Sequence, residues 1–171
     1  MTAPRPVFSI RAARPEDAPA IRQVHESSIR GLGPAAYTAA EVESWVGVLT
    51  VEKYVEAMML GDEAFIVAEA APANGGDGVI AFCSWARDEV KGLYVRPGWA
   101  RRGVGTALLR LAEAAIVGAG HRAIRIGATL VGRPFYESRG YGIVRHKKWK
   151  TRGGLVIDTL DMEKQVGETA R

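Results

Sequence analysis

Residues 93–115 read LYVRPGWARRGVGTALLRLAEAA, an apolar stretch followed by a basic turn with two glycines and then by an amphipathic segment. Glycine lets the backbone turn sharply and come close to a ligand. The first amides of a helix have no acceptor within that helix, and the helix dipole favours negative charge there. The segment therefore predicts a strand, an anion-binding turn and a helix, with a phosphate-bearing ligand over residues 102–106.

The composition limits the class of protein. A chain of 171 residues, 47% hydrophobic and 25% charged, suits a single soluble domain over residues 1–171. We expect an ordered core at about residues 7–164, since chain ends are commonly loose. Apolar runs fall short of the ~20 residues of a membrane span, and an apolar signal-peptide centre is missing, so a cytoplasmic location without membrane attachment is expected.

Cysteine and histidine usage argues against a metal site. The single Cys83 excludes an intramolecular disulfide and a multi-cysteine zinc site, and its apolar surroundings favour a small buried side chain over a nucleophile. His25, His121 and His146 lie far apart without metal-ligand spacing. His25 could face a substrate cleft, but packing within a helix is favoured.

Periodicity and turn residues predict a mixed α/β fold with one central sheet of about seven strands flanked by helices. Helices are expected from Pro15, after a capping box at Thr38 and Glu41, and after a cap at Thr50, with residues 30–37 as a loop. The expected strands are residues 8–11, 64–70, 78–85, 89–95, 123–130, 143–149 and 155–162, with a turn at 71–77. Residues 89–130 should form a parallel crossover.

Two further helices complete the predicted order. One follows the glycine turn, with Val104, Ala107, Leu108, Leu111 and Ala115 on its buried side, and the other covers residues 134–139.

Spacing then tests which phosphate ligand the glycine turn could take. A P-loop needs lysine after its last glycine, where Thr106 stands, and a dinucleotide turn needs a third glycine, where Leu108 stands. Both ATP and NAD are therefore disfavoured.

A second motif follows the turn after about 30 residues: Pro134-Phe135-Tyr136-Glu137 with Gly140-Tyr141. Together with Leu93-Tyr94-Val95 and Arg102-Gly103-Val104-Gly105, it resembles the GNAT family of acyl-CoA-dependent N-acetyltransferases. The resemblance implies a GNAT-like acyl-CoA N-acyltransferase fold and acetyl-CoA as cosubstrate, without a metal. Two positions depart from the family pattern: Ala100 replaces the usual Gln or Arg, and Val131 replaces a frequent Asn.

The resemblance also implies roles for individual residues. The pantetheine arm would pair with the main chain of the strand, and the diphosphate would lie on the turn. The implied cofactor-binding residues are Leu93, Tyr94, Val95, Arg101, Arg102, Gly103, Val104, Gly105 and Thr106. Tyr136 matches the family tyrosine near the CoA sulfur, where it would act as general acid or hydrogen-bond donor. Glu89 is the candidate general base, although a solvated strand carboxylate is an equal alternative, and Asp88 is the second choice.

The function implied is transfer of an acetyl group from acetyl-CoA to a primary amine by direct attack in a ternary complex. The acceptor could be a small molecule or a peptide, and residues 30–37 and 151–154 are expected to frame its site. A catalytically silent CoA-binding sensor or interaction module is the alternative. The net charge of +4 includes the basic run at residues 145–152, which could bind nucleic acid, but an edge hairpin protected by lysines is favoured. A homodimer is compatible with the resemblance.

Overall fold

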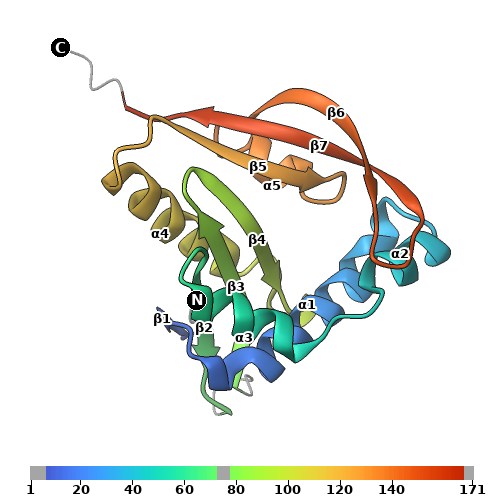
Figure 1. The fold of residues 1–171 in the computed structure, drawn as a ribbon, viewed down its shortest axis with the longest axis horizontal. Helices are drawn as coiled ribbons and strands as arrows, with labels where there is room; N and C mark the ends of the chain where they lie inside the picture. The colour runs from blue at the N-terminus through green and yellow to red at the C-terminus, as the bar shows by residue number, and fades with distance from the viewer. Residues whose placement is uncertain (1–6, 73–77, 168–171) are drawn as a thin grey trace, which may run out of the picture.

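The computed structural model describes residues 7–72 and 78–167, in which seven strands form one mixed sheet (Figure 1). The strands are β1 (Ser9–Ala12), β2 (Ala64–Ala70), β3 (Gly78–Ala86), β4 (Glu89–Val95), β5 (Ala123–Thr129), β6 (Gly142–Lys150) and β7 (Val156–Gln165). Their order is β1-β2-β3-β4-β5-β7-β6. The predicted fold class is confirmed, and β6, which carries most of the basic run, is an edge strand as expected. The predicted turn at 71–77 lies mostly outside the described residues.

Helices cover both faces of this sheet. The helices are α1 (Ala18–Leu32), α2 (Ala39–Val46), α3 (Val51–Leu60), α4 (Val104–Gly118) and α5 (Arg133–Glu137), with short 3-10 turns η1 (Pro15–Asp17), η2 (Gly33–Ala35) and η4 (Pro97–Trp99). Neighbouring strand residues alternate between two apolar clusters, as Leu93 and Tyr94 do. One cluster includes residues of α4, and the other includes residues of α1, α2 and α3, so the helices sandwich the sheet.

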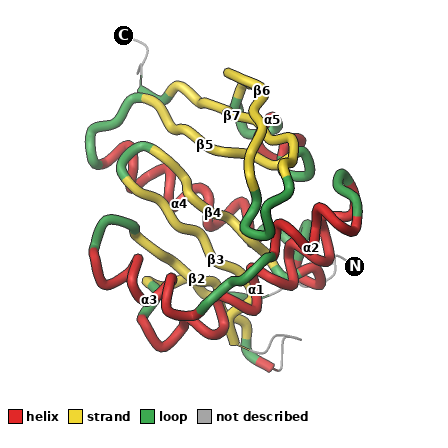
Figure 2. Tube along the Cα trace, turned by 45° about the vertical axis from the view of Figure 1, so that its right-hand side comes forward, coloured by secondary structure: helices red, strands yellow, loops and turns green. Residues whose placement is uncertain are grey.

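The predicted parallel crossover joins β4 to β5 through α4. Only two residue pairs connect the two strands, Glu89 with Arg125 and Val90 with Ile126. Beyond Val90 the strands diverge, while β5, β7 and β6 continue the sheet on the far side (Figure 2). One edge of β4 is therefore left without a strand partner from residue 91 to its end.

A β-bulge lies where the divergence begins. Ser84 pairs with Gly92 and Trp85 pairs with Val90, which leaves Lys91 as the extra residue of β4. A bulge bends its strand and redirects the side chains around it. It therefore helps to turn the second half of β4 away from β5.

The prediction of a loop at residues 30–37 was wrong for the first half of that segment. Helix α1 continues to Leu32 and is followed by η2. The glycine at position 31 suggested a break, but it serves close packing, because an added Cβ would lie 2.3 Å from Pro97 Cγ. Tertiary contact thus overrides the weak helix propensity of glycine.

Two helix details also differ from expectation. The buried residues of α4 are Val104, Leu108, Leu109, Ala112 and Ile116, whereas Leu111 is 47% exposed. The helix is apolar over much of its circumference, so the sequence pattern alone allowed either of two neighbouring faces to be the buried one.

Thr50 does precede α3 but makes no capping bond, in contrast to Thr38, whose Oγ1 accepts from the Glu41 amide at 3.3 Å.

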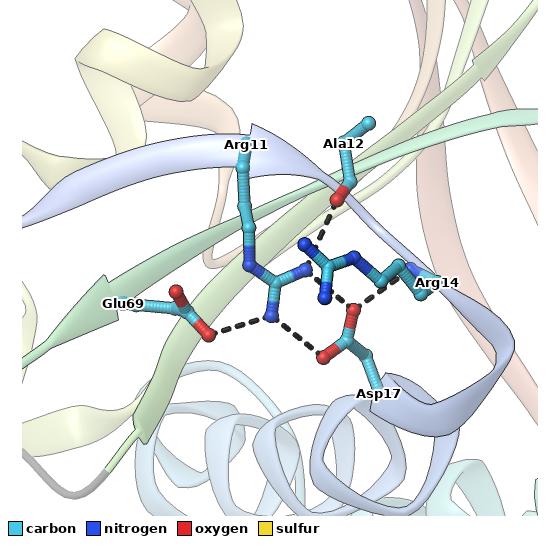
Figure 3. A network of polar contacts seen from close by, with 5 residues as sticks. All are labelled: Arg11, Ala12, Arg14, Asp17 and Glu69. Carbon is cyan, nitrogen blue, oxygen red and sulfur yellow. Dashed lines mark hydrogen bonds and ion pairs between the residues drawn. The ribbon is translucent and has the colours of Figure 1, made fainter.

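An ion network fastens the N-terminal strand to its neighbours (Figure 3). The Arg11 guanidinium donates to both carboxylate oxygens of Asp17, at 2.7 and 2.8 Å, and to Glu69 at 2.6 Å. Asp17 also accepts from the Arg14 amide at 2.7 Å. These bonds tie β1, η1 and β2 together, and the bond to Arg11 lowers the pKa of Asp17.

We expect Asp17→Asn to lower the free energy of unfolding by about 1–3 kcal/mol at neutral pH. Because the folded-state pKa of Asp17 is lowered, its contribution is complete above the ordinary aspartate pKa of about 3.9 and disappears as the pH falls through the folded-state value. Urea unfolding of both proteins at neutral and acidic pH measures this. A difference of equal size at both pH values would contradict the assignment.

Candidate functional site

The glycine turn follows β4 and η4 and opens α4 with unusual backbone angles. Arg101 has φ of +62° and Gly103 has φ of +85°. The first hydrogen bond of the helix runs from the Ala107 amide to the Gly103 carbonyl at 3.0 Å. Within the described residues, the amides of residues 101–106 have no acceptor. They form a cluster of free donors at the positive end of the helix dipole, which suits an anion.

Arginine side chains surround this turn. The Arg102 guanidinium lies 5.3 Å from the centre of the Trp99 ring. Arg139 follows α5, lies 3.6 Å from the centre of the Phe135 ring and donates to the Phe135 carbonyl at 2.8 Å and to the Thr106 hydroxyl. The Thr106 side chain is therefore engaged by protein, which leaves its amide for a ligand.

The unpaired edge of β4 runs toward the turn, from which the short η4 separates it. The Arg96 amide donates to the Ile80 carbonyl of β3 at 2.9 Å. In an antiparallel pair the hydrogen-bonded residues alternate, so Tyr94 also bonds to β3 through Phe82. The main-chain groups of Leu93 and Val95 consequently face the space beside β5. An extended amide chain could pair with them as an added strand does.

A cavity of about 80 Å³ occupies the divergence between β4 and β5. Leu93 and Tyr94 line it from β4, Thr129 from β5, and Tyr136 from α5. Tyr136 is 9% exposed and approaches Gly132 so closely that an added Cβ would lie 3.1 Å from its ring. Burial raises the pKa of Tyr136 well above the ordinary phenol value, so its hydroxyl keeps its proton.

A second cavity, of about 280 Å³, lies on the face of the sheet covered by α1 and α3. It shares Lys91, Gly92 and Tyr94 with the first cavity, so the two adjoin along β4. The remaining lining residues are His25, Leu49, Thr50, Lys53, Tyr54, Ala57, Glu63, Phe65, Phe82, Ser84 and Arg152. A ligand here would therefore reach the same strand from the opposite side.

His25 is buried in this second cavity. Its Nδ1 lies 2.7 Å from the Tyr54 hydroxyl, and its ring centre lies 3.9 Å from that of Tyr94. Burial, helped by the positive charge of Arg152, lowers the pKa of His25 to about 3. The imidazole is therefore neutral at physiological pH. From the sequence, His25 was considered as a residue of a substrate cleft, but packing of its side chain within a helix was favoured.

The predicted catalytic carboxylate lies beside these cavities rather than in them. Glu89 binds Lys91 at 3.1 Å and lines a third cavity, of about 520 Å³, together with Arg125, Arg145 and Asp161. Glu89 itself lines neither of the two joined cavities, but its partner Lys91 lines both. Its neighbour Asp88 makes two bonds of 2.8 Å to Arg125, which lower the pKa of Asp88.

The structure also describes the surroundings of the single cysteine and bears on metal binding and membrane spans. Cys83 is buried in β3, and burial raises the pKa of its thiol to about 12. In residues 7–72 and 78–167, no cluster of three or more His, Cys, Asp or Glu could hold a metal ion. No helix in the same ranges is long and apolar enough to cross a membrane.

A parallel strand pair that diverges beside a turn with free amides is a feature of an α/β protein that could hold an anionic ligand, and comparison with known proteins identifies the family. The family description "Acetyltransferase (GNAT) domain" matches residues 34–166. The chain therefore belongs to the GNAT family of acetyltransferases. No curated protein matches it significantly in sequence.

Solved structures agree on the fold. A GCN5-related N-acetyltransferase from Rhodopseudomonas palustris has a TM-score of 0.83 at 23% identity and covers 97% of this chain and 99% of its own. PaiA N-acetyltransferase from Thermoplasma acidophilum, in complex with coenzyme A, has a TM-score of 0.72 at 23% identity, covering 93% and 99%. YncA from Salmonella typhimurium, with its cofactor acetyl-CoA, has a TM-score of 0.69 at 20% identity, covering 96% and 97%.

Sequence analysis did not find every residue that lines the cavities. Tyr54 and Lys53 were read only as part of a helix, whereas Arg152 belongs to the hairpin at residues 151–154 that was expected to frame the acceptor site. No local motif marks them, because they reach the cavity from segments about 100 residues apart. Thr50 indicated where helix α3 begins, but the sequence did not indicate which face of α3 points into the cavity, because that depends on packing against α1.

Proposed function

We propose that the protein transfers an acetyl group from acetyl-CoA to an amine by direct attack within a ternary complex. The observation that carries the proposal is the unpaired edge of β4 ending at a turn with free amides. Coenzyme A and acetyl-CoA in the PaiA and YncA structures support the choice of donor. The reaction forms a C–N bond and breaks the C–S bond of the thioester.

The residues of the turn fit a CoA diphosphate. Its oxygens would accept from the amides of residues 101–106, with Arg101 and Arg102 adding positive charge. An added Cβ at Gly103 would meet nothing within 4 Å, so space for a ligand lies directly in front of the helix. The pantetheine amides would pair with the main chain of Leu93 and Val95, which face the divergence.

Tyr136 is proposed as the donor to the departing sulfur. Tyr136 lines the cavity beside Leu93, and its hydroxyl stays protonated because burial raises its pKa. A protonated phenol can donate a hydrogen bond to the thiolate as the C–S bond breaks, or pass its proton to it. The Leu93 amide is the proposed donor to the carbonyl oxygen, because Leu93 lines the cavity that Tyr136 lines and the Tyr94 amide is used by β3.

The proton of the attacking amine must also leave. Glu89 remains the proposed acceptor, acting through a water beside Lys91 because its carboxylate does not line the two joined cavities. We expect Glu89→Gln to lower kcat/KM at neutral pH by about 10-fold or more. The deficit should shrink as the pH approaches the amine pKa of about 10.4, where free base is abundant.

Steady-state rates across a pH series measure this effect. Asp88→Asn is the matched control, because that carboxylate is held by Arg125 and should affect stability rather than the pH profile. If Glu89→Gln has the wild-type profile, the amine loses its proton to solvent or to another group.

Thiol release from acetyl-CoA with a diverse amine panel tests the proposed function. We expect release that depends on the acceptor, matched by formation of the acetylated amine in a mass spectrum. Binding of CoA without turnover of any amine would instead identify a silent CoA-binding sensor. Absence of CoA binding would contradict the whole proposal.

A further inference from the structure

We infer that the acceptor is a small amine that also carries a carboxylate, and that Arg152 binds this carboxylate. The inference rests on the proposed function and specifies the substrate class of the same enzyme. The cavity of about 280 Å³ lies near the lower end of the ~300–1,000 Å³ typical of small-molecule sites. It adjoins the divergence of β4 and β5 through Tyr94 and Gly92, so an amine in it can reach the thioester.

The charges lining this cavity favour an anionic ligand. Lys53, Lys91 and Arg152 are positive, and Glu63 is the one carboxylate among its lining residues. Lys91 is paired with Glu89. Within the described residues, Lys53 and Arg152 have no carboxylate partner. An incoming carboxylate would supply the missing partner, and guanidinium binds carboxylate through two parallel bonds.

Hydrogen bonds between the β6–β7 hairpin and α2 hold Arg152 in place. Ser44 Oγ lies 2.6 Å from Thr151 Oγ1 and accepts from the Leu155 amide at 3.1 Å, while the Gly153 amide donates to the Ser44 carbonyl at 2.7 Å. Gly153 fits only without a side chain, since an added Cβ would lie 2.7 Å from Ser44 Cα. The hairpin is therefore fixed against the helix.

Within the described residues, the Arg152 guanidinium has one hydrogen-bond partner, and it also lies 5.9 Å from the centre of the Trp149 ring. Arg152 Nη1 donates to the Trp45 carbonyl at 2.9 Å, and no other acceptor among the described residues bonds to it. One backbone bond orients the group and leaves its remaining donors for a ligand. Such a pre-oriented arginine loses little conformational freedom on binding.

The positive charges also suit the chemistry of the amine. Cations near an amine favour its neutral form, which is the form that attacks a thioester. His25 is neutral and bonded to Tyr54, so it adds polarity to the cavity without adding charge. A carboxylate bound at Arg152 and an amine directed at Tyr94 fit one small amino acid better than a diamine or a simple alkylamine.

The test uses acceptors that share a side chain and differ in the anionic group: L-phenylalanine, L-phenylalaninamide and phenethylamine, with the corresponding methionine and glutamate series. Because the amine pKa also differs within a series, rates are compared per concentration of neutral amine. With acetyl-CoA and the wild-type protein, we expect kcat/KM to be about 10- to 100-fold higher for the carboxylate of at least one series than for its amide. Arg152→Gln should remove this preference while changing the rate with the amide little.

Two further variants separate recognition from folding. Lys148→Gln lies on the same hairpin, pairs with Asp158 and does not line the cavity, so it should keep the preference. Lys53→Gln removes a cavity charge without touching the hairpin and should reduce the preference even if Arg152→Gln unfolds. Equal rates for carboxylates and amides in the wild type, or equal losses for both in Arg152→Gln, would overturn the inference.

Binding measured by calorimetry gives a result that does not depend on turnover. Wild-type protein saturated with CoA should bind the carboxylate form of a series more tightly than its amide, and Arg152→Gln should not. If the carboxylates bind in this way but no amine is acetylated, the proposed reaction fails while the inferred anion site stands. If no carboxylate binds preferentially, the inference fails whether or not amines are acetylated.

Discussion

Gly103→Asp is expected to raise the dissociation constant for CoA at least about 10-fold above that of Gly103→Asn. Gly103 has φ of +85°, and aspartate and asparagine are the side chains that best tolerate this region. An added Cβ there meets open space at the start of α4. The two variants have the same shape, so their difference reports the charge placed against the diphosphate.

Calorimetric titration with CoA measures the two constants, and thermal unfolding checks the folded state. A negative charge at a helix N-terminus is stabilising by about 0.3–1 kcal/mol, so the ligand-free Asp variant should be at least as stable as the Asn variant. Weaker binding therefore cannot be attributed to unfolding. Equal dissociation constants for the two variants would place the diphosphate elsewhere.

Tyr136→Phe is expected to lower kcat about 100-fold while leaving the dissociation constant for CoA unchanged. The phenol lies in the cavity between β4 and β5 and keeps its proton because burial raises its pKa. Removing the hydroxyl deletes the donor to the departing thiolate but preserves the ring that packs against Phe135 and Tyr141.

Tyr141→Phe is the matched control for this experiment. Its hydroxyl donates to Glu113 at 2.9 Å, and its ring centre lies 5.6 Å from that of Tyr136. We expect this variant to lose about 1–3 kcal/mol of stability and to keep its kcat. Steady-state rates and urea unfolding distinguish the two outcomes. Full activity of Tyr136→Phe would remove that residue from the mechanism.

The sequence predicted the parts of the fold that local chemistry determines. The capping box at Thr38, the strand at residues 89–95 and the glycine turn all lie where expected. The register of β3 and β4 leaves the main chain of Leu93 and Val95 facing the divergence, and their pairing with a pantetheine arm stays a prediction. These features depend on neighbouring residues or on a motif, so one chain carries enough information for them.

Features that depend on distant packing could not be predicted in the same way. The buried face of α4 was misplaced at Leu111 because only the sheet decides between two apolar faces. Gly31 continues α1 because it packs against Pro97, about 65 residues later. The hairpin at residues 151–154 was expected near the acceptor, but the contacts of its neighbouring residues with Ser44, which fix Arg152 at the second cavity, have no signal in the sequence.

Backbone amide hydrogen exchange with and without CoA tests the central claim most directly, namely that the free edge of β4 and the glycine turn hold the donor. We predict that CoA slows exchange at Leu93, at Val95 and in residues 101–106, whose amides lack acceptors in the structure. Exchange along the edge strand β6 should be unchanged. Protection of β6 together with unchanged exchange at the turn would contradict the account.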